Sequence, residues 1–157
     1  MMKRETELRN WVKKVWKGVP LTWVEPRAGS SVGAADVYVP MNGLLLPVEL
    51  KLFCETAQGF KVVGAVRPAQ IAYHAGLGKV GVRSIFLFGS ADPKNKTVWF
   101  VPSWIVVGCC LNDKLLLHSQ VSVLCQDNKT NDLWFGAVLS QNAGVQNNGL
   151  LLDRMRG

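Results

Sequence analysis

Three charged residues in the first half of the chain, Asp36, Glu49 and Lys51, have the types and spacing of a metal site. Asp36 precedes Glu49 by thirteen residues, and Lys51 follows Glu49 by two. Because side chains alternate along a strand, Glu49 and Lys51 would project from one face while Leu50 points away. Hard carboxylate oxygens of this kind suit Mg²⁺ or Mn²⁺ rather than zinc. The pattern is typical of phosphodiester hydrolysis.

The flanking sequence predicts two strands joined by a turn, which would bring these charges together. Residues 35–39 form a short apolar run, residues 41–43 have turn chemistry, and residues 44–52 form a second apolar run. The alternative is a solvated strand face on which Glu49 and Lys51 meet by chance. That alternative is weakened by the apolar residues around them, because a charge inside a buried strand is costly unless it is paired or bound to metal.

An amphipathic helix is predicted over residues 3–17, before the turn at Gly18 and Pro20. Glu5 lies at the edge of its apolar stripe, so we expect Glu5, with Glu7 as the fallback, to turn toward a site under the helix. The alternative is that both acids only complement the helix dipole. The apolar stripe consists of Leu8, Trp11, Val12, Val15 and Trp16.

The rest of the chain predicts an α/β fold with a mixed central sheet flanked by helices. Strands are expected at residues 21–25, 82–88 and 97–101, with added C-terminal strands at 115–117, 121–125 and 133–139. Helices are expected at residues 67–76, ended by Gly76 and Gly78, and from Pro102 and Ser103 onward. Residues 53–65 have little periodicity and are expected to form a loop. Residues 1–139 would form a single domain, and residues 140–157 a polar linker and tail.

In their order along the chain, these motifs resemble the PD-(D/E)xK nuclease superfamily over about residues 3–90. Glu5-Thr6-Glu7-Leu8 is similar to the acidic start of the first helix in resolvases of this superfamily. Arg27-Ala28-Gly29-Ser30 is similar to the Arg-x-Gly-Ser turn that precedes their metal-binding strand. Asp36 and Glu49-Leu50-Lys51 have resolvase-like spacing, and Arg67-Pro68-Ala69-Gln70 opens a helix with the glutamine often found after the lysine. The sequence departs from the pattern at Ala35, where the family name expects proline.

The nearest resemblance is to archaeal-type and phage Holliday-junction resolvases and to virus-type replication and repair nucleases. It implies a small restriction-endonuclease-like core and Mg²⁺-dependent DNA cleavage, with Mn²⁺ as a substitute, that leaves a 5′-phosphate. Asp36, Glu49 and the Leu50 carbonyl are expected to bind the metal, and Glu5 a second metal or a water. Lys51 would orient the attacking water or stabilise developing charge. Gln70 would position water or phosphate.

The charge distribution favours DNA as the partner. The net charge is +7, and residues 1–90 contain twelve Lys or Arg and six Asp or Glu. A basic surface beside carboxylates suits a polyanion. The DNA contacts expected are Lys13, Arg27, Ser30, Lys61 and Arg67. A four-way junction has two symmetric scissile phosphates, which predicts a homodimer. A general or nicking phage-type nuclease and a catalytically silent DNA-binding module remain as alternatives.

Several classes of protein are disfavoured by the sequence. The four cysteines show no CxxC spacing, so a zinc site is not expected and the thiols should be reduced. The longest apolar run is too short to cross a bilayer. We find no P-loop and no dinucleotide fingerprint, and therefore expect no nucleotide cofactor. These features predict a soluble protein of a reducing compartment, the cytoplasm, or the host cytoplasm if the protein is virus-encoded.

Overall fold

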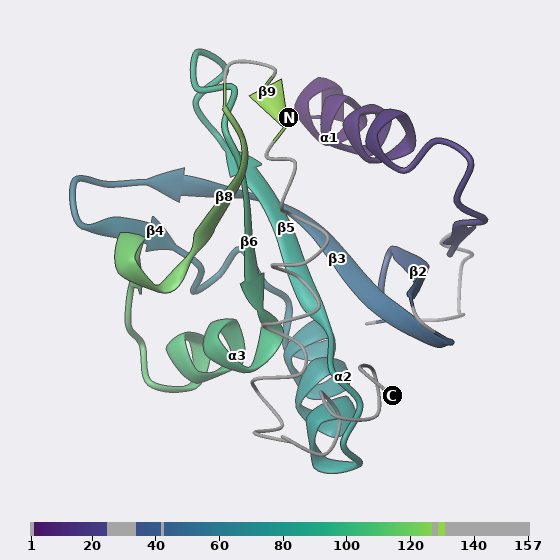
Figure 1. Ribbon diagram of the computed structural model, residues 1–157. Coiled ribbons are helices and arrows are strands. Elements are labelled where there is room, and N and C mark those ends of the chain that lie inside the picture. Colours follow the sequence, from purple (N-terminus) through teal and green to yellow (C-terminus); the bar gives the residue numbers. More distant parts are fainter. Residues whose placement is uncertain (1, 25–33, 42, 127–128, 131–157) are drawn as a thin grey trace.

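The computed structural model describes residues 2–24, 34–41, 43–126 and 129–130 (Figure 1). The strand expected at residues 133–139 and the linker expected at 140–157 lie outside the described residues. The helices are α1 (Met2–Val15), α2 (Pro68–Lys79) and α3 (Ser103–Leu111), with a 3₁₀ turn at His118–Gln120. The strands are β1 (Thr22–Trp23), β2 (Val37–Met41), β3 (Leu44–Glu55), β4 (Gly59–Lys61), β5 (Ile85–Ser90), β6 (Val98–Pro102), β7 (Leu116–Leu117), β8 (Ser122–Gln126) and β9 (Lys129–Thr130).

The described strands form one mixed sheet in the order β1-β2-β3-β5-β6-β8-β9, with β4 paired to both β3 and β7. The β3–β5 pair is parallel, and the other pairs between these strands are antiparallel. Parallel neighbours need a crossover connection, which here contains β4 and α2. The predicted α/β class is confirmed, with a mixed central sheet and flanking helices. Two of the predicted C-terminal strands are present as β7 and β8, and β9 was not predicted.

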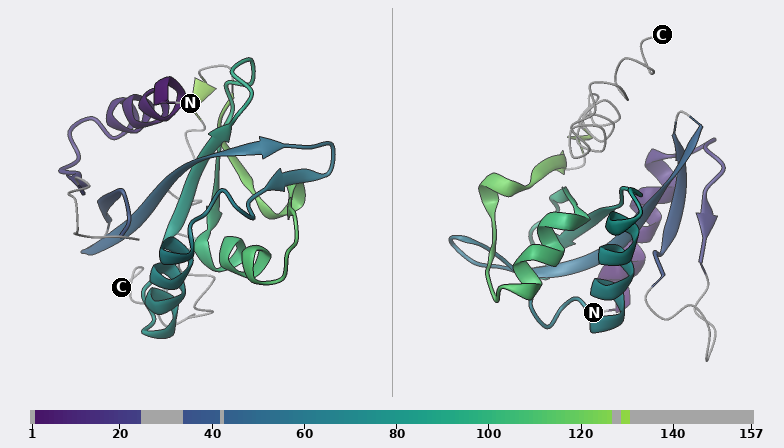
Figure 2. Two further views of the ribbon diagram at one scale, coloured as in Figure 1. Left: turned by 180° about the vertical axis from the view of Figure 1, so that it is seen from behind. Right: turned by 90° about the horizontal axis from the view of Figure 1, so that it is seen from below.

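The two faces of the sheet are covered by different helices (Figure 2). The face covered by α1 is called the α1 face, and the face covered by α2 and α3 the α2–α3 face. Side chains alternate between the faces along the central strands, as the pleat requires. On the α1 face, Leu8 and Val12 of the helix, with Trp16 directly after it, pack with Val37, Val39, Leu46, Val48, Leu50, Ile85, Leu87, Val98 and Phe100. The α2–α3 face carries Phe53, Phe60, Phe86, Phe88, Trp99, Val101 and Val106.

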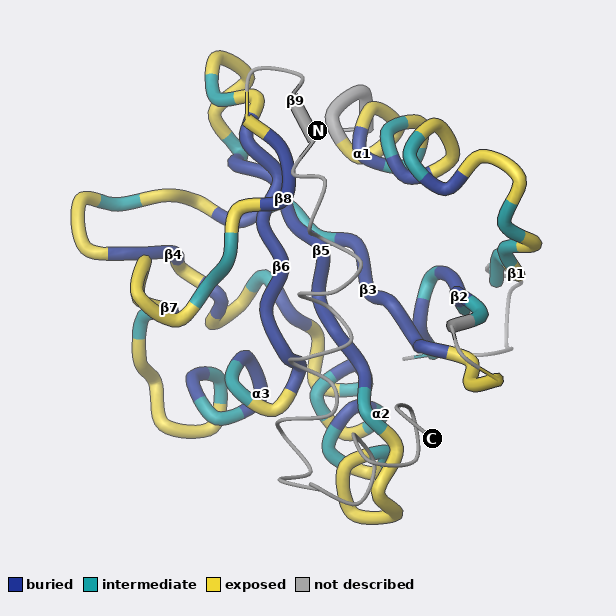
Figure 3. The backbone as a smooth tube through the Cα atoms, in the orientation of Figure 1, coloured by how far each residue is buried: buried dark blue, intermediate teal, exposed yellow. Residues whose placement is uncertain are grey.

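The central strands β5 and β6 are buried along their whole length, and β3 is buried through its middle (Figure 3). All six residues of β5 and all five of β6 are buried, so these strands lack the polar alternation of a half-exposed sheet. The layers on both sides explain this pattern, and they mean that any charged side chain on these strands must find a partner inside the protein.

Two segments differ from the sequence-based predictions. Residues 53–65, expected to be a loop, instead extend β3 to Glu55 and return as β4, because Phe53 and Phe60 pack into the aromatic core. Gly59 lies so close to β7 that an added Cβ would stand 2.1 Å from the Leu116 carbonyl oxygen. Helix α2 continues through both glycines to Lys79 rather than ending at them.

All four cysteines lie within the described residues and are free thiols. The Cys109 and Cys110 thiols approach the carbonyl oxygens of Leu115 and Val62 at 3.6 and 3.8 Å. Burial raises the pKa of both thiols, so they stay protonated near neutral pH. None of the helices that the structure describes is both long enough and apolar enough to cross a membrane.

Candidate metal site

The β2–β3 hairpin brings Asp36 and Glu49 together. Val37 pairs with Val48 in the antiparallel register, so the preceding residue, Asp36, lies opposite Glu49. Residues directly opposite each other in an antiparallel pair have their side chains on the same face. The Leu50 main-chain N–H also donates a hydrogen bond to Asp36 Oδ2 at 2.8 Å. The two carboxyl groups therefore share the α2–α3 face.

The hairpin turns at Gly43, within the segment where the sequence predicted a turn. Gly43 adopts a φ of 77°, in the left-handed region that glycine enters without strain. Met41 pairs with Leu44 across the turn, which fixes the register for the rest of the hairpin. A shift of one residue would turn Glu49 to the α1 face, so the turn also determines where the carboxylate points.

Glu49 is the most deeply buried charged side chain among the described residues, at 1% exposure. Both of its carboxyl oxygens have partners on α2. Gln70 Nε2 donates to Glu49 Oε1 at 2.6 Å, and His74 Nε2 lies 3.1 Å from Glu49 Oε2. Gln70 and His74 are four residues apart, so they lie on one side of the helix and reach the carboxyl group together. Gln70, which was predicted to position water or phosphate, is thus in direct contact with Glu49.

Gln70 is held by the start of its own helix. Its Oε1 accepts a hydrogen bond from the Arg67 main-chain N–H at 3.0 Å, at the N-cap of α2. Since the carbonyl end of the amide is used by the backbone, the NH₂ end is the one that faces Glu49. The helix terminus therefore fixes the orientation of the amide.

The environment of Glu49 strongly disfavours its negative charge. Burial raises the pKa of Glu49 to about 9, and repulsion from Asp36 and a hydrogen bond with Asp36 act in the same direction. Two cations oppose these effects, Lys51 and then Arg67. Lys51 lies on the same strand face as Glu49 and is half-buried, whereas Arg67 is exposed. Without an added cation, the carboxyl group is held in its protonated form.

The donor set fits a hard divalent cation. Two adjacent carboxyl groups raise each other's proton affinity when alone, and a cation bound between them would remove that repulsion. Mg²⁺ commonly uses one or two protein carboxylates and completes its shell with water and substrate phosphate. Among the described residues, no group of three His, Cys, Asp or Glu side chains is close enough to hold a metal. Asp36 and Glu49 stay the predicted side-chain ligands, and the Leu50 carbonyl the predicted third ligand.

Two serines, whose importance the sequence did not indicate, extend the Glu49 cluster. His74 Nδ1 lies 2.8 Å from Ser84 Oγ, which in turn contacts Ser103 Oγ. Ser103 Oγ donates to the Ser84 carbonyl oxygen at 3.0 Å. The structure places His74 in the core, in contact with Glu49. The i, i+4 spacing of Gln70 and His74 could have shown that they share a face.

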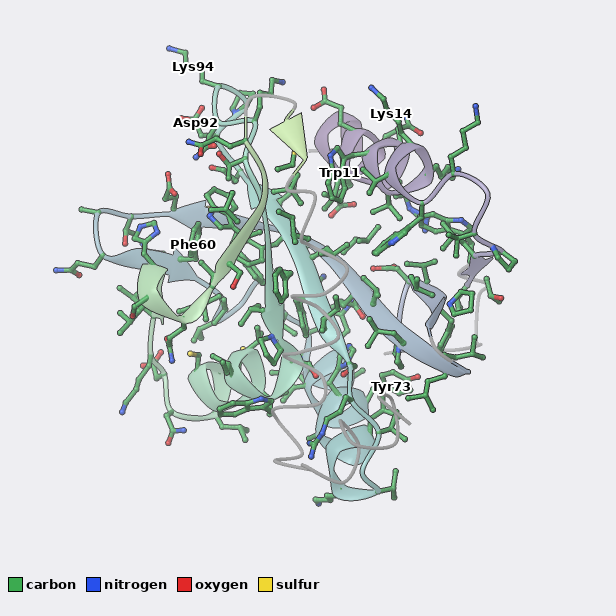
Figure 4. All side chains as sticks on the ribbon, viewed as in Figure 1. Trp11, Lys14, Phe60, Tyr73, Asp92 and Lys94 are labelled. Atoms are coloured by element: carbon green, nitrogen blue, oxygen red, sulfur yellow. The ribbon has the colours of Figure 1, made fainter. Side chains whose placement is uncertain are left out.

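A second pair of side chains joins α2 to the hairpin. The hydroxyl groups of Tyr38, on β2, and Tyr73, on α2, lie within hydrogen-bond distance of each other. Figure 4 labels Tyr73 on this helix. Burial and this contact raise the pKa of Tyr73, so the phenol stays protonated at physiological pH. The pair fastens the outer strand of the site to the helix that carries Gln70 and His74.

The α1 face holds two residues that the sequence assigned to the site. Glu5 and Lys13 are exposed on α1, which packs on the opposite face of the sheet from Glu49. The structure therefore does not bring Glu5 to Asp36 or Glu49, and its role at a second metal remains a prediction. Lys13 Nζ lies over the Trp23 ring, 5.2 Å from its centroid.

Glu7, the fallback for Glu5, belongs to a separate hollow on the α1 face. This cavity of about 270 Å³ lies between α1 and the central strands and is lined in part by Trp11, Leu52 and Val98. Glu7 and Lys96 form an ion pair of 3.8 Å at its edge, with both side chains about half exposed. Neither carboxylate of α1 joins the metal site.

The other predicted DNA contacts are placed as follows. Arg67 lies at the N-terminus of α2, close enough to Glu49 to lower its pKa. Lys61 is exposed on β4, opposite Cys54 near the far end of β3. Arg27 and Ser30 lie outside the described residues. The structure thus gathers Arg67 with the metal site and places Lys61 at a different end of the sheet.

Comparisons with known proteins add little to the description of this site. No protein-family model matches the chain. No curated protein matches it either. Among solved structures, the chain is similar to Hjc, a Holliday junction resolvase from the archaeal hyperthermophile Archaeoglobus fulgidus. The identity is 14% and the TM-score 0.43, over 62% of this chain and 75% of that chain. A likeness at this level carries no argument about activity.

Proposed function

We propose that this protein is a metal-dependent DNA endonuclease that hydrolyses phosphodiester bonds. The observation that carries the proposal is the placement of Asp36, Glu49 and Lys51 on one face of the β2–β3 hairpin. Two carboxylates with an adjacent lysine can serve a metal and a phosphate at one point. These residue types and their spacing, with Gln70 on the following helix, resemble the motif of PD-(D/E)xK nucleases.

Asp36 and Glu49 would hold Mg²⁺ or Mn²⁺, with the Leu50 carbonyl as a further oxygen. The bound ion would polarise the scissile phosphate and lower the pKa of a nearby water. Lys51 would hold that water or the non-bridging phosphate oxygens through a charge-assisted hydrogen bond. Attack forms one P–O bond and breaks another, so that one product ends in a 5′-phosphate and the other in a 3′-hydroxyl, which takes the departing proton.

A branched DNA such as a four-way junction is the proposed substrate, and a homodimer the proposed assembly. A junction presents two equivalent phosphates, and two subunits related by symmetry would present two equivalent sites. The three helices among the described residues all pack against the sheet, and none of these residues forms a separate element for reading base sequence. Cleavage that depends on DNA shape rather than on base sequence is consistent with this arrangement.

The hydrogen bonds of Glu49 with Gln70 and His74 favour one other candidate function, a DNA-binding module without catalysis. With its acid protonated and both oxygens bound by Gln70 and His74, the cluster satisfies itself as a buried polar network. In a DNA-binding module without catalysis, such a network would serve only the fold. Uptake of a divalent cation separates the two candidates, because the module has no need of one.

The proposal is tested by incubating the protein with Mg²⁺ and end-labelled DNA: a four-way junction, a nicked duplex, a linear duplex and a single strand. We expect paired cuts in the junction, with Asp36→Asn inactive but still able to bind DNA. Asp92→Asn is the matched control, because Asp92 is exposed in the loop after β5. Cutting of all four DNAs would indicate a general nuclease. Absence of cutting with both Mg²⁺ and Mn²⁺ would contradict the enzyme.

A further inference from the structure

Helix α3 has no charged residue on any of its sides. Its nine residues, Ser103–Leu111, are apolar apart from the serine at its start. Val106 and Cys109 pack into the aromatic core, on the side that faces the sheet. On the outward side Trp104 is 56% exposed and Leu111 is 71% exposed. A helix that is apolar all round is normally buried all round, so the exposure of two large apolar side chains indicates a contact surface.

The exposed residues of α3 form a short row, which is called the α3 stripe. Trp104, Gly108 and Leu111 are four and three residues apart, which places them on one side of the helix. Gly108 faces open space, because an added Cβ there would meet nothing within 4 Å. Val82 lies beside the stripe, since it is exposed and lines the same small hollow as Trp104. The α3 stripe is therefore large at both ends and flat in the middle.

This arrangement matches a second copy of the same helix. If two α3 helices pack antiparallel and cross at Gly108, Trp104 of each copy lies beside Leu111 of the other. The missing side chain at the crossing point allows the two helix axes to approach closely. A two-fold axis requires a self-complementary surface, on which residue i of one copy contacts residue j of the other and the reverse. The α3 stripe has this property.

Charge favours a second copy over DNA at the α3 stripe. The net charge of the chain is +7, so two copies repel each other where their basic surfaces meet. Residues 97–112, which include β6 and α3, have no charged side chain, so a contact through α3 avoids this repulsion. DNA phosphates are bound mainly by Lys and Arg, and α3 has neither.

We propose that the α3 stripe is the contact surface of a homodimer, in which two α3 helices pack antiparallel across a two-fold axis at Gly108. The inference deepens the proposed function by naming the surface of its dimer, and it rests on that function only for the use of the dimer. Helix α2 lies between α3 and the β2–β3 hairpin (Figure 1). The two metal sites would therefore flank the axis, each separated from it by one helix. A surface of this size fits the weaker specific interfaces, which bury less than about 1,200 Å² in total.

A charge added at Gly108 tests the dimer without harming the fold. Sedimentation velocity of the full chain, from about 1 μM to about 1 mM, should show a monomer–dimer equilibrium. Gly108→Lys should weaken the dimer about a hundredfold or more, because it places like charges at the axis. Its urea midpoint, measured where the wild type is monomeric, should be no lower than that of the wild type, because lysine forms helix better than glycine and the site is open. Damage to the fold would instead lower this midpoint.

Gly76→Lys is the matched control. Gly76 is an exposed glycine within α2, and an added Cβ there also meets nothing within 4 Å. The substitution adds the same charge outside the α3 stripe, so dimerisation should be unchanged. Trp104→Ala should weaken the dimer about thirtyfold, as truncation of a central aromatic residue commonly does. In the wild type, amide chemical shifts that change with protein concentration should cluster in α3.

Three results would overturn the inference. The first is a wild type that stays monomeric up to about 1 mM. The second is a dimer that is as strong in Gly108→Lys as in the wild type, because it would use another surface. The third is a loss of DNA affinity in Trp104→Ala without a change in self-association. That result would make the stripe a DNA surface, with Arg83 lining the hollow beside Trp104.

The same samples separate this inference from the proposed function. If the wild type dimerises through α3 but cuts no DNA, the proposed function fails and the dimer surface stands. If the wild type cuts a four-way junction while monomeric, the dimer surface fails and the nuclease stands. If both hold, Gly108→Lys should nick the junction one strand at a time, whereas Gly76→Lys should keep the paired cuts.

Discussion

The two faces of the central sheet are built by alternate residues of the same strands, yet they differ in composition. The buried core on the α1 face consists of aliphatic and aromatic side chains together with Cys125. The α2–α3 face is aromatic under α3 but polar under α2, where Glu49, Gln70 and His74 are buried together. The buried positions of the α2–α3 face are therefore not all apolar. Polar groups are present where each one has a partner.

Helix α2 shows the same difference at a smaller scale. Its two buried residues are Gln70 and His74, so the side that faces the sheet is polar. Helix α1 covers its own face with Leu8 and Val12, and Trp16 follows the helix directly. Since apolar burial gives most of the stabilisation in helix packing, α2 gives up part of this stabilisation to place two polar side chains on Glu49. Such an arrangement suits a functional site.

Neighbouring residues of β5 offer the sharpest test of the comparison between faces. Phe86 faces His74 and Leu87 faces α1, and both are fully buried. Phe86→Ala should destabilise the fold by about 3–5 kcal/mol and Leu87→Ala by about 2–5 kcal/mol, in urea unfolding. Only Phe86→Ala should also weaken Mn²⁺ binding, because it removes the support of the His74 ring. Equal loss of Mn²⁺ binding in both variants would show that the faces are not independent.

Two glutamates on the same face of β3 provide the second test. Glu49→Gln keeps the shape of the protonated side chain but removes a metal ligand, and should lower DNA cleavage by about a hundred- to a thousandfold. Glu55→Gln is the control, since Glu55 is exposed at the end of the strand and contacts Asn95. DNA affinity, measured without metal, should be the same in both. Full cleavage by Glu49→Gln would remove Glu49 from the mechanism.

The dependence of the free energy of unfolding on pH should arise from two groups on the α2–α3 face, Glu49 and His74. Burial raises the pKa of Glu49 to about 9 and lowers the pKa of His74 to about 4. Above pH 6.5 the unfolded chain has neither of these protons, whereas the native pair keeps one on Glu49. Stability should therefore fall as pH rises from about 6.5 to about 9, by at most about 1.4 kcal/mol per pH unit.

Below pH 6.5 the two groups should oppose each other. Between about pH 4.5 and 6.5 the unfolded chain has one proton on His74 and the native pair has one on Glu49, so their contributions cancel. Urea midpoints of the metal-free protein measured across these ranges check the pattern. In Glu49→Gln the fall above pH 6.5 should disappear. If it persists in that variant, the slope arises elsewhere.

The smallest expected effect concerns the surface of α1. Arg9 and Lys13 both lie over the Trp23 ring, at 4.9 and 5.2 Å from its centroid. If this surface contacts DNA phosphates, Lys13→Ala should weaken binding several-fold and reduce the slope of log affinity against log salt by about one. Lys79→Ala, at the exposed end of α2, is the control. An unchanged slope in Lys13→Ala would remove α1 from the DNA surface.

The sequence was sufficient for the parts of the site that depend on local pattern. Alternation along β3 predicted that Glu49 and Lys51 share a face, and the turn before Gly43 predicted their approach to Asp36. The helix that carries Gln70 was expected after Pro68. These features depend on residues that are close in sequence, so a short stretch of sequence is enough to predict them.

The remaining parts depend on contacts between distant segments. Ser84 and Ser103 meet because β5 and β6 are antiparallel neighbours, and neither residue has a motif of its own. The helical wheel gave Glu5 a position near the apolar stripe of α1, but it could not tell which face of the sheet α1 would cover. The length of β3 was also missed, because Phe53 is held in the strand by aromatic residues far along the chain.

The pairing of β3 has a consequence for the order in which the protein folds. Its contacts with β2 are closed by a tight turn, whereas its parallel contacts with β5 need the whole crossover that contains α2. Short closures form faster than long ones. We therefore expect the Leu50 amide, which bonds Asp36, to gain protection from solvent exchange before the amides of β5 in pulse-labelling experiments. The carboxylate pair would then exist before its partners on α2 arrive.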